Sequence, residues 1–279
     1  MIYEETMKPT LEDFGKDGDI TEKAVLRMLE NIACYHSDML GYGAGNMNET
    51  MIGWILLEWK VKILRLPKYG ERLRVTTWSR GKATLFTTYR DFELFGEAGD
   101  VCVIASSKWA LIDLRTKRPA VISEELIEKY QTEGRHVFEA PDMERLREPR
   151  EYTGGTAFRV GRRDIDLNGH VHNLCYLDFA YEALPEEVYR NEVFHDIRIT
   201  YRKEIKPEET VACKYVYEDG AHTVGIYGED GTLRSLVTLA CRLHVWKKSP
   251  VFLRCFCYAI LRLLFGRFIY TNPKYFLFL

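Results

Sequence analysis

The chain has 279 residues, a length that fits one large or two modest domains, and its 46% hydrophobic and 29% charged residues are typical of a globular protein. The net charge of −2 gives no reason to expect a nucleic acid as partner. The seven cysteines are scattered, without a CxxC pair or a Cys/His cluster, so we expect reduced thiols, no metal site and no cofactor.

The first half of the chain predicts one long helix followed by a run of strands. Its N-terminal segment is acidic and polar, unlike a signal or transit peptide, and we expect a cytoplasmic protein. Thr21 can cap a helix over 21–40, in which apolar residues recur at helical spacing. Strand-like runs, separated by Pro and Gly, follow at 51–66, 72–79, 84–94 and 101–114, and a short helix is predicted over 124–131.

The second half repeats this order. A helix is predicted over 173–190, and strands at 195–204, 210–218, 222–228 and 233–246. The repeat predicts an α+β fold in which one helix wrapped by a curved antiparallel sheet occurs twice. The charged, Pro-containing stretch between the halves indicates a linker. The expected parts are an N-terminal domain over 1–140, a linker over 141–158, a C-terminal domain over 159–248 and an apolar tail over 249–279.

The residues with catalytic potential concentrate in 162–176, which reads RRDIDLNGHVHNLCY. Asp166, Asn168 and His170 are two residues apart, so an extended segment would project a carboxylate, an amide and an imidazole to one side. A helix beginning at about Asn173 would point free N–H groups at a developing oxyanion. The same residues also fit a loop whose Asp and Asn side chains cap that helix, and spacing alone leaves both interpretations open.

The run Asp166-Leu-Asn168-Gly-His170-Val-His172-Asn173 resembles the D-x-N-x-H-V-x-N signature of the acyl-acyl carrier protein (acyl-ACP) thioesterases. The similarity extends over residues 1–247. It includes Pro67-Lys-Tyr-Gly70, Val75-Thr-Thr-Trp78, Arg90, Ser106-Ser-Lys-Trp109 and Tyr201-Arg-Lys-Glu204. The resemblance implies two hotdog domains in tandem and hydrolysis of fatty acyl-ACP to free fatty acid and holo-ACP, which ends chain elongation.

The resemblance also implies a catalytic set of Asp166, Asn168, His170 and Glu204. Asn168 would anchor the thioester carbonyl, and the other three would orient and deprotonate a water. We expect Glu204 or Asp166 to be the water-activating carboxylate, with His170 as its proton partner.

The first half carries no such motif before its helix, so we expect one active site per chain and an acyl-binding role for the first half. Trp54, Leu56 and Trp78 are candidates for the acyl channel, although each also fits a plain sheet core.

One departure from the family concerns cysteine. Many plant members have a cysteine after the glutamate, where this chain has Ile205, so a Cys–His mechanism cannot operate at that position. We expect Cys175, on the predicted helix, to be part of the core. We also expect His172 to face away from the neighbours of His170 and to lie outside the catalytic set.

The implied partner is an acidic acyl carrier protein, and the chain itself is expected to be a monomer or a homodimer. The basic residues that bracket the motif could form its docking patch or simply a solvated face; they are Arg162, Arg163, Arg202, Lys203 and Lys206. The alternatives are an acyl-CoA thioesterase or another hotdog thioester enzyme, such as a hydroxyacyl dehydratase. A non-enzymatic acyl-thioester sensor would need a basic DNA-binding segment, which the sequence does not show.

The tail is the one compositional anomaly. Residues 251–269 approach the ~20 apolar residues needed to cross a bilayer, but Arg254, Arg262 and Arg267 interrupt them. We therefore expect a peripheral appendage, at a membrane interface or docked on the domain, and outside the catalytic fold.

Overall fold

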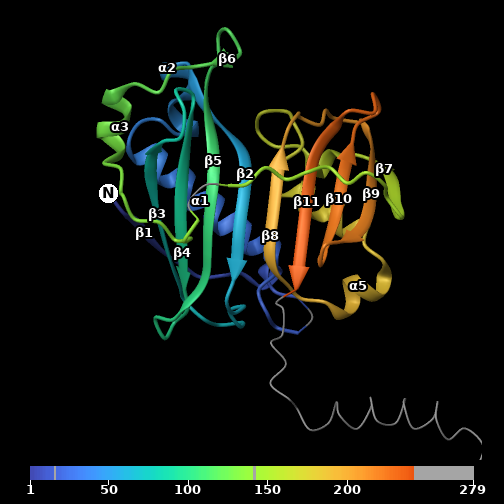
Figure 1. Cartoon of the computed structure of the whole chain (residues 1–279). Coiled ribbons are helices and arrows are strands. Elements are labelled where there is room, and N and C mark those ends of the chain that lie inside the picture. The colour runs from blue at the N-terminus through green and yellow to red at the C-terminus, as the bar shows by residue number, and fades with distance from the viewer. Residues whose placement is uncertain (16, 141–142, 242–279) are drawn as a thin grey trace, which may run out of the picture. The chain divides into compact units, whose positions relative to one another are not determined.

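The computed structural model describes residues 1–15, 17–140 and 143–241 (Figure 1). The helices are α1 (Glu22–Met39), α2 (Met47–Thr50), α3 (Glu124–Tyr130), α4 (Cys175–Glu182) and α5 (Glu186–Asn191). The strands are β1 (Tyr3–Met7), β2 (Ile52–Ile63), β3 (Leu73–Lys82), β4 (Thr87–Phe95), β5 (Val101–Asp113), β6 (Arg118–Pro119), β7 (Gly154–Arg159), β8 (Phe194–Tyr201), β9 (Thr210–Glu218), β10 (Ala221–Tyr227) and β11 (Leu233–Cys241).

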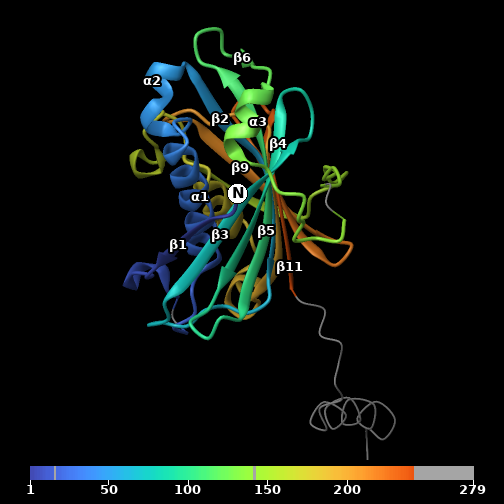
Figure 2. The same cartoon turned by 90° about the vertical axis from the view of Figure 1, so that its left-hand side faces the viewer.

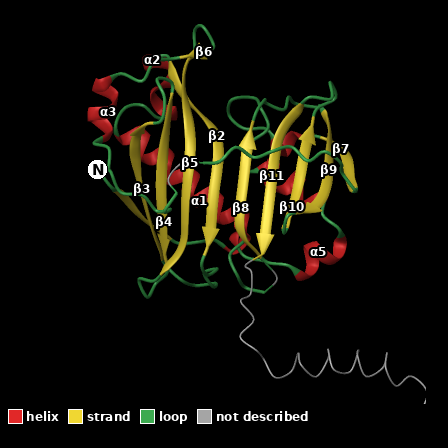
Figure 3. Cartoon of the chain, in the orientation of Figure 1, coloured by secondary structure: helices red, strands yellow, loops and turns green. Residues whose placement is uncertain are grey.

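The strands form one antiparallel sheet in the order β1-β3-β4-β5-β2-β8-β11-β10-β9-β7, with β6 paired to β5 (Figure 3). The two halves meet where β2 pairs with β8, and the buried Trp59 lies opposite the buried Ile199. Helix α1 packs on β1 and β3 of the first half, and α4 packs on β9, β10 and β11 of the second. The predicted α+β class with two hotdog halves is confirmed.

Helix α1 forms as predicted. The Thr21 hydroxyl accepts a hydrogen bond from the Ala24 amide at 3.2 Å and caps the helix. Its apolar stripe, which includes Leu26, Leu29 and Ile32, is fully buried against the sheet. Helix α1 lies along one face of the sheet in the first half (Figure 2), so its apolar stripe can pack on that face.

The prediction of one continuous helix over 173–190 is wrong. Helix α4 ends at Glu182, and α5 begins at Glu186, directly after Pro185. Proline lacks an N–H donor and disfavours helical backbone in the residue before it, so it interrupts the helix here.

The segment that joins the two halves crosses the face of the sheet opposite α1 (Figures 1 and 2). Arg198 of β8 donates a hydrogen bond to the carbonyl of Glu144 in this segment. Strand β7 begins at Gly154, inside the range predicted for the linker, and pairs with β9. The domain boundaries at 140 and 159 stay predictions.

Residues Met1–Cys241 form one compact unit. The tail over 249–279 lies outside the described residues, so its predicted role as an appendage stays a prediction. Among the helices in the described ranges, none is long and apolar enough to span a membrane.

Candidate active site

The segment between β7 and α4 carries the Asp-Asn-His motif in a tight loop. A bridge between Ile165 and Val171 closes its base. The Asp166 amide donates to the His170 carbonyl at 2.8 Å, and the Gly169 amide donates to the Asp166 carbonyl at 3.1 Å. Gly169 has a φ of +77°, a left-handed conformation that glycine adopts without strain. The segment is therefore not extended, and a turn brings the motif residues together.

The carboxylate of Asp166 holds this turn. Its Oδ1 atom accepts hydrogen bonds from the backbone amides of Asn168 at 2.8 Å and His170 at 3.3 Å. Its Oδ2 atom lies 3.4 Å from the Asn168 side-chain amide, which donates to it. Asp and Asn commonly make such local bonds in loops. Asp166 thus fixes where Asn168 and His170 lie, and it caps the loop rather than α4.

Ile205 brings Glu204 to the loop. The buried Ile205 accepts a hydrogen bond on its carbonyl from the Val171 amide at 3.1 Å, and its own amide donates to the Tyr176 hydroxyl at 3.2 Å. As a result, His170 Nε2 lies 3.3 Å from Glu204 Oε2, with the two side chains 44% and 51% exposed. Two of the four predicted site residues therefore form an acid–base pair that solvent can reach.

The expectation that the second helix offers free N–H groups is wrong for its first turn. Leu174 N donates to His172 Nδ1 at 3.2 Å, and Cys175 N donates to the His172 carbonyl at 2.9 Å. Tyr176 N lies 3.3 Å from the Asn173 carbonyl, to which it donates. These donors are engaged within the loop, so they do not form an oxyanion hole.

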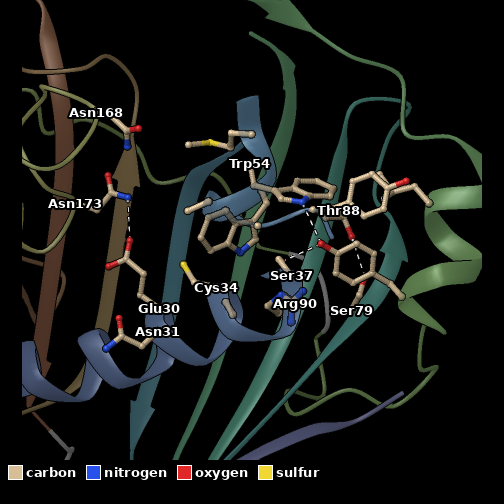
Figure 4. A pocket seen from close by; sticks show the side chains of 18 of the residues that line it. Glu30, Asn31, Cys34, Ser37, Trp54, Ser79, Thr88, Arg90, Asn168 and Asn173 are labelled. Carbon is tan, nitrogen blue, oxygen red and sulfur yellow. Dashed lines mark hydrogen bonds between the residues drawn. The ribbon is translucent and has the colours of Figure 1, made fainter. Parts of the chain in front are cut away.

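A cavity of about 290 Å³ runs along α1, a volume at the lower end of the range for ligand sites (Figure 4). At one end it is lined by the motif loop, through Asp166, Leu167, Asn168, His172 and Asn173. From there it follows Glu30, Cys34 and Ser37, which succeed one another along α1 in Figure 4. The cavity therefore connects the motif loop of the second half with the interior of the first half.

The far end of the cavity lies entirely in the first half and is polar. Trp54 Nε1 donates to the Tyr130 hydroxyl at 3.1 Å, which donates to Ser37 Oγ at 2.9 Å. Arg90 also lines this end, and burial lowers its pKa. Burial, with the nearby Arg90 charge, lowers the pKa of His36 to about 3, so its neutral ring accepts a hydrogen bond from Arg90 at 2.9 Å.

Of the three aromatic and aliphatic residues expected in an acyl channel, only Trp54 lines this cavity. Leu56 is buried in the core, and the indole of Trp78 donates to the Arg135 carbonyl at 3.0 Å. For these two residues, the sheet-core interpretation is the one that the structure supports.

The cavity lining does not include His170 or Glu204; it includes His172 and Glu30 instead. The expectation that His172 faces away from the neighbours of His170 is wrong, because His172 lines the cavity together with Asp166 and Asn168. Glu30 is a residue that the sequence patterns did not single out. The sequence feature that could have identified Glu30 is its place in the helix: it lies four residues after Leu26 and three before Ala33, on the side of α1 that carries the buried apolar residues.

The cysteines near the site are not reactive thiols. Cys175 belongs to the core, as predicted, and burial raises its pKa to about 11. Cys34 lines the cavity, but burial raises its pKa to about 11 as well. A neutral thiol is a poor nucleophile, so neither side chain is prepared for covalent catalysis at neutral pH. Within the described residues, no group of three His, Cys, Asp or Glu side chains is arranged to hold a metal.

The five basic residues that bracket the motif in sequence are all exposed: Arg162, Arg163, Arg202, Lys203 and Lys206. Lys203 pairs with Asp230 at 2.9 Å, and Arg163 lies 3.7 Å from Asp164. They are available to a partner, with two of them near acidic neighbours.

Two family models match the chain. The acyl-ACP thioesterase N-terminal domain matches residues 1–130, and the acyl-ACP thioesterase C-terminal domain matches residues 147–231. The chain belongs to the acyl-ACP thioesterase family. The resemblance inferred from the motif is thereby confirmed.

Curated relatives of this acyl-ACP thioesterase family member include plant proteins. Oleoyl-acyl carrier protein thioesterase 1 of Arabidopsis thaliana is 23% identical over 228 residues, which is 76% of this chain and 62% of that protein. The dodecanoyl-[acyl-carrier-protein] hydrolase of Cinnamomum camphora is 21% identical and is covered to 63%. The chain thus spans about three-fifths of the length of these relatives.

Solved structures share the fold. An acyl-ACP thioesterase from Bacteroides thetaiotaomicron superposes with a TM-score of 0.76 at 20% identity, covering 86% of this chain and 97% of that one. The 12:0-ACP thioesterase from Umbellularia californica gives a TM-score of 0.75 at 19% identity with the same coverage. At these identities the likeness establishes the architecture of the family member and leaves its substrate open.

Proposed function

We propose that this protein hydrolyses fatty acyl-ACP thioesters to free fatty acid and holo-ACP, and so ends fatty-acid chain elongation. The observation that carries the proposal is the cavity along α1, whose one end is the Asp166–Asn168 loop. A cavity that extends from the motif loop along α1 fits a chain-like ligand with its reactive end at the loop, where Asp166, Asn168 and His172 line it. Family membership and the names of the relatives support the same chemistry.

In this mechanism the acyl chain lies along α1 and the thioester carbonyl lies at Asn168, whose amide stabilises the developing oxyanion. Water attacks the carbonyl carbon, a tetrahedral intermediate forms, and its collapse expels the phosphopantetheine thiolate. Asp166 holds the loop in the required geometry, since both of its carboxylate oxygens accept bonds from the loop. His170, paired with Glu204, exchanges protons with the reacting groups.

The deciding assay measures thiol release from acyl-ACP and acyl-CoA over a series of chain lengths. A higher kcat/KM for acyl-ACP supports the proposal, whereas a preference for acyl-CoA indicates an acyl-CoA thioesterase. Formation of an enoyl product from a 3-hydroxyacyl thioester, without free thiol, would indicate a dehydratase. Absence of thiol release from every thioester would remove the hydrolase proposal.

Acyl carrier protein is the proposed partner, and the exposed basic residues around the loop supply a surface that would attract an acidic protein. Membrane contact through the apolar tail, a monomeric or homodimeric state and a cytoplasmic location stay predictions.

A further inference from the structure

Glu30 is a largely buried carboxylate in the cavity, on the α1 helix of the first half. Its side chain is 13% exposed, and it lines the cavity beside the motif loop. Its Oε1 atom accepts a hydrogen bond from the Asn173 side-chain amide at 3.3 Å (Figure 4). Within the described ranges, no Lys or Arg forms an ion pair with it. A carboxylate is costly to bury without a cation, so its presence in a cavity indicates a functional role.

The side chains of His172 and Glu30 lie opposite each other in the cavity, at a separation that one water molecule can bridge. The Nδ1 atom of His172 accepts a hydrogen bond from the Leu174 amide at 3.2 Å, so the neutral ring carries its proton on Nε2. That Nε2 atom lies 3.9 Å from Glu30 Oε2, too far for a direct hydrogen bond. One oxygen atom can bond to both groups at such a separation, accepting from His172 and donating to Glu30.

We propose that Glu30 is a further catalytic residue of the thioester hydrolysis proposed above, accepting the proton of a water that it holds together with His172. The inference rests on that proposed function and assigns the base within the same site. It places the base on the cavity side of the loop, where the acyl chain would bring the thioester carbon. The half-exposed His170–Glu204 pair then has the separate role of protonating the leaving thiolate.

The proton and electron changes balance. The water oxygen forms a bond to the thioester carbon as its O–H proton passes to Glu30, and the carbonyl π pair moves to the carbonyl oxygen. When the oxyanion collapses, the C–S bond breaks and its electron pair leaves with sulfur. Protonated His170, paired with Glu204, gives its proton to the thiolate. Glu30 then loses its proton to solvent and His170 regains one, so the cycle consumes water and thioester only.

The charged and titratable groups that face Glu30 change its basicity. Burial raises the pKa of Glu30, the hydrogen bond from Asn173 lowers it, and the charge of Asp166 raises it. The other titratable neighbours are Tyr201 of β8 and Cys34 of α1. Burial raises the pKa of both, so both are neutral at pH 7. A carboxylate with a raised pKa is a stronger base than an exposed one.

The test compares Glu30→Gln with a matched control, Glu22→Gln. Glu22 is also on α1, burial also raises its pKa, and it does not line the cavity. With acyl-ACP, we expect Glu30→Gln to lower kcat by about 100-fold or more at a KM within about threefold of wild type. We also expect the acid limb of its kcat/KM profile to be lost. Glu22→Gln should keep both the rate and the profile.

A folded Glu30→Gln variant with wild-type kcat and an unchanged acid limb would overturn the inference. If that variant does not fold, Glu30→Asp decides. A reduced kcat with the acid limb retained supports the base role, and a wild-type kcat contradicts it. A wild-type protein that releases no thiol from any acyl thioester refutes the proposed function instead, and the two failures are thereby distinguished.

Discussion

The backbone of Ile205 forms a hydrogen bond with Val171, and this pairing brings the side chains of Glu204 and His170 to 3.3 Å from each other. The segment that follows β8 and the motif loop are distant in sequence, so the acid–base pair depends on the packing of the second half. Ile205 is fully buried, and its amide is also engaged, by Tyr176. An apolar residue at this position therefore supports the site although it has no catalytic group.

Removal of the charge from this pair should impair hydrolysis without unfolding the protein. We expect Glu204→Gln to lower kcat by about 10²–10⁴, the usual range for loss of a positioned acid–base group. Glu204 is half-exposed, so circular dichroism and thermal unfolding should match wild type. A folded Glu204→Gln enzyme with full activity in the thiol-release assay would exclude the His170–Glu204 pair from catalysis. Asp166→Asn serves as a comparison, and it should also loosen the loop, because its acceptor Oδ2 is replaced.

Cysteine substitutions should have little effect. Burial raises the pKa of the Cys175 and Cys34 thiols to about 11, so a very small fraction of either is thiolate at pH 7. Cys175→Ala and Cys34→Ala should each retain most of the wild-type kcat, and iodoacetamide at neutral pH should inactivate the enzyme slowly. An inactive but folded Cys34→Ala variant would point to a covalent mechanism in the cavity. The same result for Cys175→Ala would require the helix to open.

The long elements could be predicted from the sequence because their signals are local. The Thr21 cap and the apolar stripe predicted α1, and the strand β9 begins and ends where alternation and turn residues placed it. The break at Pro185 was also visible in the sequence, but the apolar spacing on either side of it favoured one helix. The pairing of β2 with β8 could not be predicted, because strand order depends on packing between distant segments.

The site was predictable in its residue types and less so in its geometry. The motif identified Asp166, Asn168 and His170, but a period-two pattern cannot reveal a turn held by the Asp166 carboxylate. Glu30 is supplied by the other half of the chain, far from the motif in sequence. Only the fold brings its carboxylate to within 3.9 Å of His172.

Recognition of an acidic carrier should depend on salt. The five basic residues around the loop are exposed, and interactions between exposed charges weaken with ionic strength. We expect kcat/KM for acyl-ACP to fall more steeply between about 50 and 300 mM NaCl (on the order of tenfold) than that for a short neutral thioester. In the double variant Arg163→Glu/Arg202→Glu, the salt dependence of kcat/KM for acyl-ACP should become closer to that for the short thioester. Equal salt slopes for the two substrates in the wild type would count against a basic docking surface.

Removal of the tail should leave the catalytic unit intact. Residues Met1–Cys241 form a compact unit that contains every strand of the described sheet. A chain truncated after Lys248 should therefore be folded, retain kcat within about threefold of wild type and bind anionic vesicles less than the full chain. The measurements are the thiol-release assay and vesicle co-sedimentation. An insoluble or inactive truncated protein would show that the tail belongs to the core.

Burial of Glu30 should reduce stability in a pH-dependent way. Because burial raises its pKa in the folded state, the folded protein holds the Glu30 proton more tightly than the unfolded chain does. This contribution to the free energy of unfolding is fully present below the unfolded pKa and is lost as pH rises through the raised folded pKa. Glutamine has no proton to lose, so Glu30→Gln should gain stability over wild type as pH rises across this interval, and the gain should then level off.

Urea unfolding of both proteins at pH 5 and pH 8 measures this difference. The Glu22→Gln control should show a gain of the same sign, since burial also raises the pKa of Glu22. Only Glu30→Gln should combine greater stability at pH 8 with lower activity, as expected where a catalytic carboxylate is retained at a cost in stability. If the stability difference between Glu30→Gln and wild type is the same at both pH values, Glu30 does not carry a raised pKa. The acid limb of the wild-type rate profile would then need another source.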